Sequence, residues 1–162
     1  MLNIPQFRTN IVRPTLVAMA AHGEAAENLV LGTALQESHL HYVRQLRDGP
    51  ARGLYQMEPA THDDIWDNYL RYRPGTRAGV EAFLVPGQER IDQLVWNLAY
   101  ATAMCRVHYQ RVPEALPAMD DIPGLAKYWK QYYNTPQGRG TTAEFVEKFE
   151  TYVIATGRDP HA

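Results

Sequence analysis

QERIDQLVWNLAYATAMCRVHYQRV, residues 88–112, is the longest stretch of the chain with a helical pattern of apolar residues. The residues of its stripe recur at spacings of three, four and seven, which keep to one helix face, and Pro113 ends the pattern. They are Ile91, Leu94, Val95, Leu98, Thr102, Cys105 and Val112. We expect this segment to form one long, central and mostly buried helix.

Helical patterns on both sides of this segment extend the prediction along the chain. Further helices are expected at about 14–22, from 24 to about 37, at about 59–70, at 125–133 and from 141 to 157. Gly23 and Gly157 end two of them. The spacing of Thr141 and Glu144 predicts a capping box at the start of the last helix. The fold class is therefore predicted to be all-α, mainly helical.

Two stretches lack this periodicity. Residues 71–79, RYRPGTRAG, are expected to break the helical pattern. Residues 39–53 are expected to form a loop or short irregular strands, with at most a very small irregular β element in the 39–57 region. A loop of this length in a small domain is usually functional. No linker or repeat divides the chain, so residues 1–162 are predicted to form a single domain.

The composition is that of an ordinary globular protein, with 45 % hydrophobic and 21 % charged residues, which argues against a long disordered tail. Sixteen Lys and Arg residues against eighteen Asp and Glu residues give a net charge of −2. A strongly basic surface for nucleic acid is not expected at this charge. No stretch approaches the length of a membrane span, and none forms a secretory signal sequence.

The single cysteine and the histidines do not form a recognisable metal or redox motif. Cys105 lies on the apolar stripe of the expected central helix and is interpreted as a small core residue. His39 and His41 flank a carboxylate and His62 precedes two others, but no third ligand follows at a familiar spacing. We therefore expect no metal and no other cofactor.

Glu37 is the first anomaly in the sequence, because it continues an apolar stripe to the end of a helix. The stripe consists of Ala26, Val30, Thr33, Ala34 and Glu37. Desolvation and the negative end of the helix dipole both disfavour the carboxylate there, so the pKa of Glu37 is expected to be raised. A carboxyl that stays protonated near neutral pH can serve as a general acid in glycoside cleavage. The alternative is that Glu37 is a boundary residue with an ordinary pKa, or that it forms a salt bridge with Arg44 or Arg47.

Glu37 belongs to the first of three short motifs. QES stands at 36–38, the segment LYQMEPAT at 54–61 directly follows ARG, and YYNTPQG stands at 132–138. Their order and spacing resemble the soluble lytic transglycosylases of the lysozyme-like superfamily. The resemblance covers roughly residues 24–140 and implies a lysozyme-like helical fold.

The resemblance also implies roles for individual residues. Glu37 matches the catalytic acid and base of the family, and Ser38 matches the neighbouring serine that helps to hold the reacting sugar or the carboxyl group. Gln56 matches a glutamine that lines the glycan cleft. Tyr133 matches the tyrosine whose hydroxyl contacts the catalytic carboxyl, and Asn134 matches its neighbour at the cleft edge.

Glu58 stands where the family usually has an apolar residue. A glycosidase that uses water often needs a second carboxylate to activate it. Glu58 is the candidate for this role, and Asp48, Asp63 and Asp64 are nearby in sequence. The aromatic residues Tyr128, Trp129, Tyr132 and Tyr133 either pack in the core or line a sugar-binding face.

The resemblance implies a bacteriolytic enzyme that cleaves the β-1,4 bond between N-acetylmuramic acid and N-acetylglucosamine in the glycan strand of peptidoglycan. A lytic transglycosylase needs one acid and no water, whereas a muramidase needs water. The alternative from another class is a non-catalytic lysozyme-like protein that serves a phage virion as a structural or glycan-binding component.

The N-terminal stretch, which carries no secretory signal, bears on where such a protein acts. A bacterial enzyme of this class is normally exported, whereas a bacteriophage protein reaches the cell wall within a virion or at lysis. We therefore expect a phage-encoded protein that is made in the host cytoplasm and acts at the bacterial cell wall. Its expected partners are peptidoglycan and other virion proteins.

Overall fold

The computed structural model describes residues 1–134 and 137–156, and these are mainly helical, which confirms the all-α class. The α-helices are α1 (Ile4–Phe7), α2 (Arg13–Ala18), α3 (Glu24–Ser38), α4 (Pro59–Asn68), α5 (Pro74–Glu81), α6 (Arg90–Trp96), α7 (Leu98–Gln110), α8 (Ile122–Trp129) and α9 (Thr142–Phe149). Short 3-10 or π-helical segments lie at Arg8–Val12, Leu46–Asp48, Leu70–Tyr72, Lys130–Asn134 and Glu150–Ile154.

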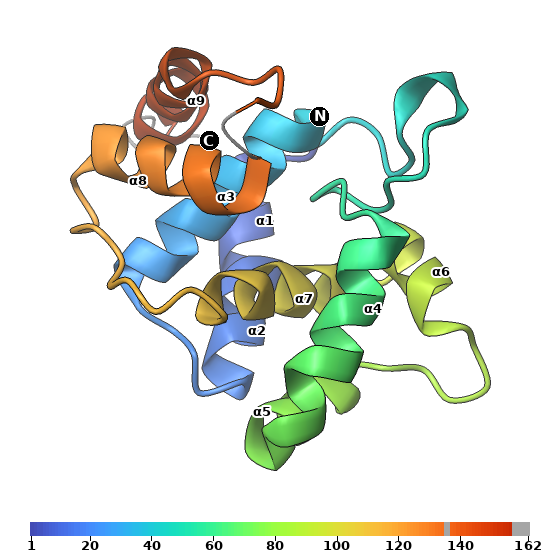
Figure 1. The fold of residues 1–162 in the computed structure, drawn as a ribbon. Helices are drawn as coiled ribbons and strands as arrows, with labels where there is room; N and C mark the ends of the chain where they lie inside the picture. The colour runs from blue at the N-terminus through green and yellow to red at the C-terminus, as the bar shows by residue number, and fades with distance from the viewer. Residues whose placement is uncertain (135–136, 157–162) are drawn as a thin grey trace.

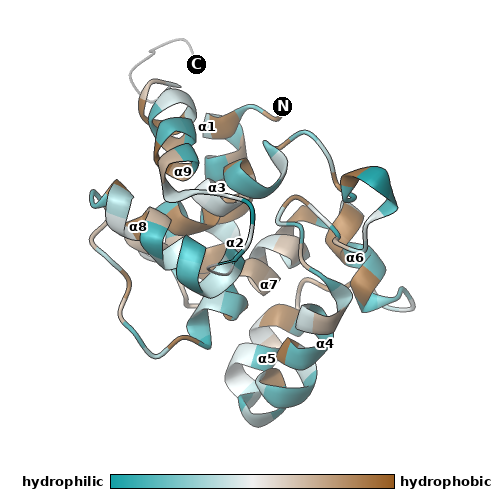
Figure 2. Ribbon diagram, turned by 45° about the horizontal axis from the view of Figure 1, so that its top comes forward, coloured by the Kyte–Doolittle hydropathy of each residue, from teal (hydrophilic) through white to brown (hydrophobic). Residues whose placement is uncertain are grey.

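Helices α3 and α7 form the centre of the molecule (Figure 1). Helix α3 packs against α8 and α9, and α7 packs against α2, α4, α5 and α6. Both central helices bury residues around most of their circumference. The outer helices α4 and α9 instead alternate hydrophobic and hydrophilic residues around their axes, as helices with one buried face do (Figure 2).

The expectation of one long helix over 88–112 is wrong, because the helix is broken at Asn97. This residue has an extended backbone (φ −96°, ψ 91°), and its side-chain oxygen accepts a hydrogen bond from the backbone N–H of Tyr100 as the N-cap of α7. Its side-chain amide donates to the carbonyl of Phe83 at 2.8 Å. Hydrophobic periodicity continues through such a break, because a capping side chain leaves the apolar spacing unchanged.

Two other expectations need correction. The first helical segment runs from Ile4 through the π-helical turn to Ala18, rather than from about 14 to 22. Residues 71–79 were expected to interrupt helical structure, yet α5 begins inside them at Pro74, a residue suited to a first helical turn. Helix α4 begins at Pro59 as expected.

The C-terminal helix α9 begins with the predicted capping box, in which the Thr141 side chain and the Glu144 side chain bond to each other's backbone N–H groups. It buries Phe145 and Phe149 against α3 and α8. A Cβ atom on Gly32 of α3 would lie 2.2 Å from Cζ of Phe145, so the two helices meet at a glycine. The expected helix end at Gly157 lies outside the described residues.

The segment between α3 and α4 is held by isolated β-bridges, Arg44 with Arg52 and Arg52 with Met57, and this is the extent of its β structure. Gly53 directly follows Arg52, which takes part in both bridges, and has φ +75°. A Cβ atom there would come within 2.3 Å of the carbonyl oxygen of Leu94 in α6. Gly53 thus lets the segment approach the backbone of α6 closely.

Gly53→Ala is expected to destabilise the fold by about 2 kcal/mol or more, because it adds left-handed backbone strain to a clash with a backbone carbonyl. Gly75→Ala is the matched control, since a Cβ atom at Gly75 meets nothing within 4 Å. Urea denaturation of both variants measures the effect. Equal stabilities would contradict the close approach of the segment to α6.

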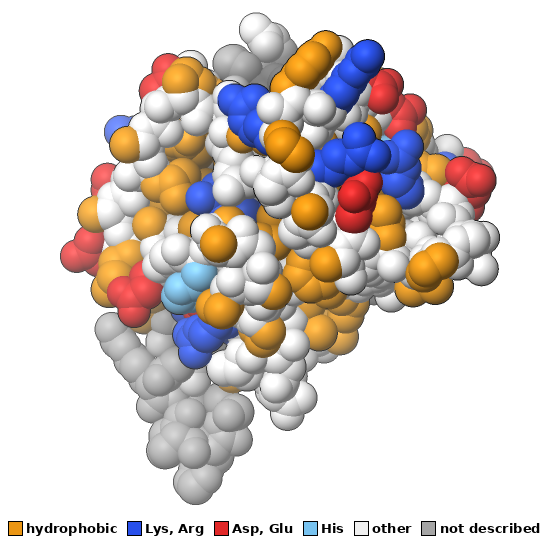
Figure 3. Space-filling view, turned by 90° about the horizontal axis from the view of Figure 1, so that it is seen from below, with side chains coloured by type: hydrophobic (Ala, Val, Ile, Leu, Met, Phe, Trp, Pro, Cys, Tyr) orange, Lys and Arg blue, Asp and Glu red, His pale blue; other side chains and the backbone are white. Residues whose placement is uncertain are grey.

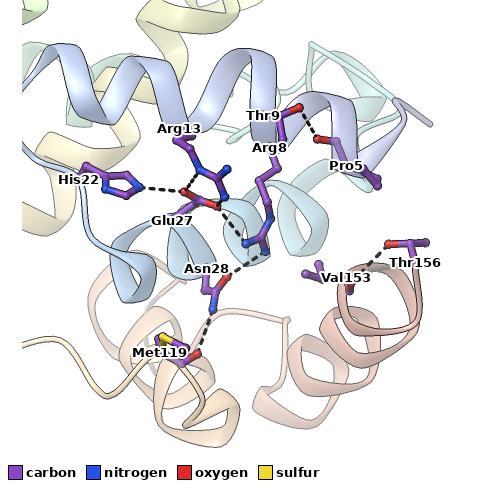
Figure 4. A network of polar contacts seen from close by, with 10 residues as sticks. All are labelled: Pro5, Arg8, Thr9, Arg13, His22, Glu27, Asn28, Met119, Val153 and Thr156. Atoms are coloured by element: carbon purple, nitrogen blue, oxygen red, sulfur yellow. Dashed lines mark hydrogen bonds and ion pairs between the residues drawn. The ribbon is translucent and has the colours of Figure 1, made fainter. Parts of the chain in front are cut away.

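A buried carboxylate ties the N-terminal helices to α3 (Figure 4). The side chain of Glu27 is 1 % exposed and pairs with Arg8, Arg13 and His22 at 2.9–3.0 Å. Burial by itself would raise the pKa of Glu27, but hydrogen bonds from Arg13 and His22 and the nearby charge of Arg8 hold it below its ordinary value. Glu27 therefore stays ionised inside the protein near neutral pH.

Candidate functional site

A cavity of about 490 Å³ lies where α3, α4, α7 and the segment between α3 and α4 meet. It is lined by Glu37, Tyr42, Gln45, Leu46, Ala51, Gln56, Met57, Glu58, Thr61, His108, Tyr133 and Asn134. Five of the six predicted site residues are among them. Residues that are up to 97 positions apart in the sequence, Glu37 and Asn134, therefore share one cavity wall.

Glu37 lies in the last turn of α3, and burial raises the pKa of its carboxyl to about 7. The hydrogen bond from the Trp129 indole and the charge of Lys148 act in the opposite direction. The indole N–H of Trp129 donates to Oε1 of Glu37 at 2.9 Å. The structure thus gives Glu37 the raised pKa that its place on the apolar stripe predicted, and no ion pair forms with Arg44 or Arg47 among the described residues.

The turn after Glu37 fixes the end of α3. His39 and Leu40 both adopt left-handed backbone angles, with φ +52° and φ +54°. The hydroxyl of Ser38 donates to the carbonyl of Ala34 and accepts the backbone N–H of Leu40. Ser38 is fully buried, so the expectation that it contacts the sugar or the carboxyl is not met, and it stabilises the turn instead.

Tyr133 reaches the cavity, but its hydroxyl donates to the carbonyl of Tyr55 at 2.7 Å rather than to Glu37, which corrects the predicted contact. Burial raises the pKa of Tyr133 well above its ordinary value, so the hydroxyl remains a donor. The side chain of Gln56, a residue with φ +48°, donates to the carbonyl of Gly53 at 2.8 Å. Asn134 accepts a hydrogen bond from Lys130 at 2.8 Å.

His108 is a cavity residue that the sequence analysis missed. Burial lowers its pKa to about 4, so the ring is neutral near pH 7. Nε2 of His108 donates to the carbonyl of Tyr132 at 2.8 Å, and the ring centre lies 4.6 Å from that of Tyr133. His108 therefore holds the Tyr132–Tyr133 turn against α7. A histidine that continues the face of a buried helix is the signal that could have found it.

A second, smaller recess of about 330 Å³ shares Glu37 with the first cavity. Its lining consists of Gln36, Glu37, Trp129, Asn134, Arg139, Gly140 and Glu144. Trp129 lines the smaller recess and is absent from the lining of the larger one. Glu37 thus lines both hollows, and the indole that contacts its Oε1 lines the smaller one.

The other carboxylates named from the sequence differ in their surroundings. Glu58 is exposed, lines the larger cavity and directly precedes α4. Asp63 pairs with the buried His62, and Asp64 accepts hydrogen bonds from Asn68 and Arg111. Glu58 is therefore the one of these carboxylates that faces the cavity next to Glu37.

Residues 1–134 and 137–156 contain neither a candidate metal site nor a membrane-spanning helix. No group of three or more His, Cys, Asp or Glu side chains is placed to hold a metal ion there, and no helix there is long and apolar enough to cross a membrane. His62, which the sequence singled out, contacts the hydroxyl of Tyr100 in the core. On the face seen in Figure 3, basic and acidic side chains both occur, with hydrophobic and uncharged ones between them.

Glu37→Gln is expected to stabilise the fold increasingly as the pH rises. The carboxyl loses its proton near pH 7 in the folded protein and near 4.5, its ordinary pKa, in the unfolded chain. Charging it in the folded state therefore costs stability as the pH rises from about 4.5 through 7. The stability of the variant minus that of wild type is expected to be larger at pH 8 than at pH 4 by about 3 kcal/mol. Denaturant titrations at the two pH values measure this, and a pH-independent difference would contradict it.

Comparisons of the chain with models of protein families, with curated proteins and with solved structures find no match. The resemblance to the lytic transglycosylases therefore rests on the motif residues alone.

Proposed function

We propose that this chain is a peptidoglycan-cleaving enzyme of the lytic transglycosylase type, with Glu37 as its single general acid and base. The observation that carries the proposal is the carboxyl of Glu37, whose pKa is raised to about 7, in the wall of a 490 Å³ cavity. Gln56, Tyr133 and Asn134, which the motifs single out independently of any periodicity, line the same cavity. The volume lies within the range of small-molecule binding sites, and the glutamine, asparagine and glutamate side chains of the lining can form hydrogen bonds with sugar hydroxyls.

The reaction begins with the protonated carboxyl of Glu37. It donates its proton to the oxygen between the two sugars as the bond from that oxygen to C1 of N-acetylmuramic acid breaks. The carboxylate that results then accepts the proton of the 6-hydroxyl of the same muramic acid, whose oxygen attacks C1. The product is a 1,6-anhydro ring, and Glu37 regains its proton without the use of water.

The masses of the products test the proposal. Purified protein is incubated with isolated peptidoglycan, and the released muropeptides are weighed. Fragments that are lighter by one water than reducing muropeptides are the expected result. Reducing ends would indicate a muramidase, whereas no release from several types of peptidoglycan would favour a non-catalytic lysozyme-like protein of a phage virion.

Glu58→Gln is expected to leave the rate and the products unchanged. Glu58 is exposed, and a transglycosylase needs no second carboxylate to activate water. Rates of muropeptide release from wild type and variant at pH 6 measure the effect. A loss of about tenfold or more, together with reducing ends in the wild-type products, would assign Glu58 to a hydrolytic mechanism instead.

A further inference from the structure

The buried indole of Trp129 holds the carboxyl of Glu37 from one side. Trp129 is fully buried in α8, and its ring packs against Phe145 of α9 at 5.6 Å between ring centres. On another side, a Cβ atom on Gly140 would lie 2.6 Å from Cη2 of the ring. The orientation of the indole is therefore fixed by packing, and so is the direction of its N–H.

An indole N–H is a donor only. A protonated carboxyl has one hydroxyl oxygen, which needs an acceptor, and one carbonyl oxygen, which is the better acceptor. The hydrogen bond from Trp129 to Oε1 of Glu37, at 2.9 Å, therefore favours the form with Oε1 as the carbonyl oxygen. The proton then resides on Oε2.

We propose that Trp129 is a positioning residue that fixes the proton of Glu37 on Oε2, the oxygen left for the larger cavity. This proposal rests on the proposed function for its catalytic meaning. The indole lines the smaller recess, whereas Glu37 lines both hollows. A proton held on Oε2, the oxygen away from the indole, is directed at a sugar bound in the larger cavity. The carboxyl is therefore already oriented for proton donation at the start of each catalytic cycle.

The same contact influences the titration of Glu37, because the ionised carboxylate accepts the indole N–H more strongly than the neutral acid does. Lys148 on α9 is the charged group that also lowers the pKa of Glu37. Cys105 and Tyr109 on α7 and Tyr133 are further titratable groups near it, and burial keeps all three neutral by raising their pKa values. Glu58 and His108 line the larger cavity with Glu37, and Arg139 and Glu144 line the smaller recess with it.

The test compares Trp129→Phe with Trp66→Phe. Trp66 is a matched control, because it is also buried and its indole N–H donates to the hydroxyl of Tyr100 at 3.0 Å. We expect Trp129→Phe to lower kcat about tenfold with little change in KM, and to move the alkaline limb of the pH profile to higher pH. Trp66→Phe is expected to change neither.

A titration of ¹³C-labelled glutamate carboxyls, with Glu37→Gln for assignment, reads the same contact without any substrate. A higher pKa of Glu37 in Trp129→Phe but not in Trp66→Phe supports the proposal. If wild type releases nothing from peptidoglycan, the proposed function fails, but this titration still tests the role of Trp129. An unchanged titration overturns it, and so does a wild-type kcat in Trp129→Phe. If that variant does not fold, benzothienylalanine at position 129 replaces the N–H by sulfur and keeps the shape of the ring.

Discussion

Glu37→Gln is expected to lower the rate of peptidoglycan cleavage by about 10³-fold, since a positioned general acid and base contributes on the order of 10²–10⁴. The amide keeps an oxygen that can accept the Trp129 N–H, so the shape of the site is retained. It has no proton to give to the leaving oxygen and cannot accept one in return. Muropeptide release at pH 6, followed over time, measures the loss.

The stability of the same variant provides the control. A fall in activity from misfolding would come with a lower midpoint of denaturation, whereas the loss of the buried ionisable group predicts an unchanged or higher midpoint above pH 7. Wild-type activity should also decline above pH 7, because the acid form of Glu37 is depleted there. Retention of more than a tenth of the wild-type rate in the folded variant would remove Glu37 from the mechanism.

Glu27→Ala is expected to cost about 3 kcal/mol of stability, which corresponds to a fall in Tm of roughly 6–12 °C for a domain of this size. Glu27 accepts hydrogen bonds from both Arg8 and Arg13 and lies beside His22 (Figure 4). Its removal leaves Arg8, Arg13 and His22 without their shared carboxylate and creates a cavity where the Glu27 side chain was buried. Thermal denaturation at pH 7 measures the effect.

The pH dependence of this effect has a definite sign. The pKa of Glu27 is lower in the folded than in the unfolded chain, so its ionic contribution is present above the ordinary value of 4.5 and is lost as the pH falls through the folded value. The difference from wild type should therefore shrink in acid. Glu24→Ala, an exposed position in the same first turn of α3, should change stability by less than about 0.5 kcal/mol at either pH.

The parts of the fold that depend on local chemistry could be predicted from the sequence. Pro59 begins α4 and Thr141 caps α9, because the fixed φ of proline and the reach of a threonine hydroxyl act over one helical turn. The break at Asn97 could not be predicted from hydrophobic spacing. The break depends on a hydrogen bond from the Asn97 side-chain amide to the carbonyl of Phe83, a residue that lies outside the 88–112 pattern.

In the candidate site, too, features that depend on neighbouring residues could be predicted, and features that depend on distant residues could not. The place of Glu37 at the end of an apolar stripe is a local property, and it predicted the direction of the pKa shift. The donor to its carboxyl is not local, because Trp129 is 92 positions away and nothing in its own segment separates it from the neighbouring aromatic residues. The burial of Ser38 likewise follows from the left-handed turn at His39 and Leu40, which no spacing rule predicts.

The contact between Gly32 and Phe145 bears on when the site can be completed during synthesis. Phe145 also packs on Trp129, so the ring that holds the carboxyl of Glu37 is supported by α9, which follows α3 and α8 in the chain. A chain that is leaving the ribosome has synthesised α3 long before α9. The surroundings of Glu37 are therefore incomplete until residues 142–149 have been made, and a truncation before residue 141 removes that support together with α9.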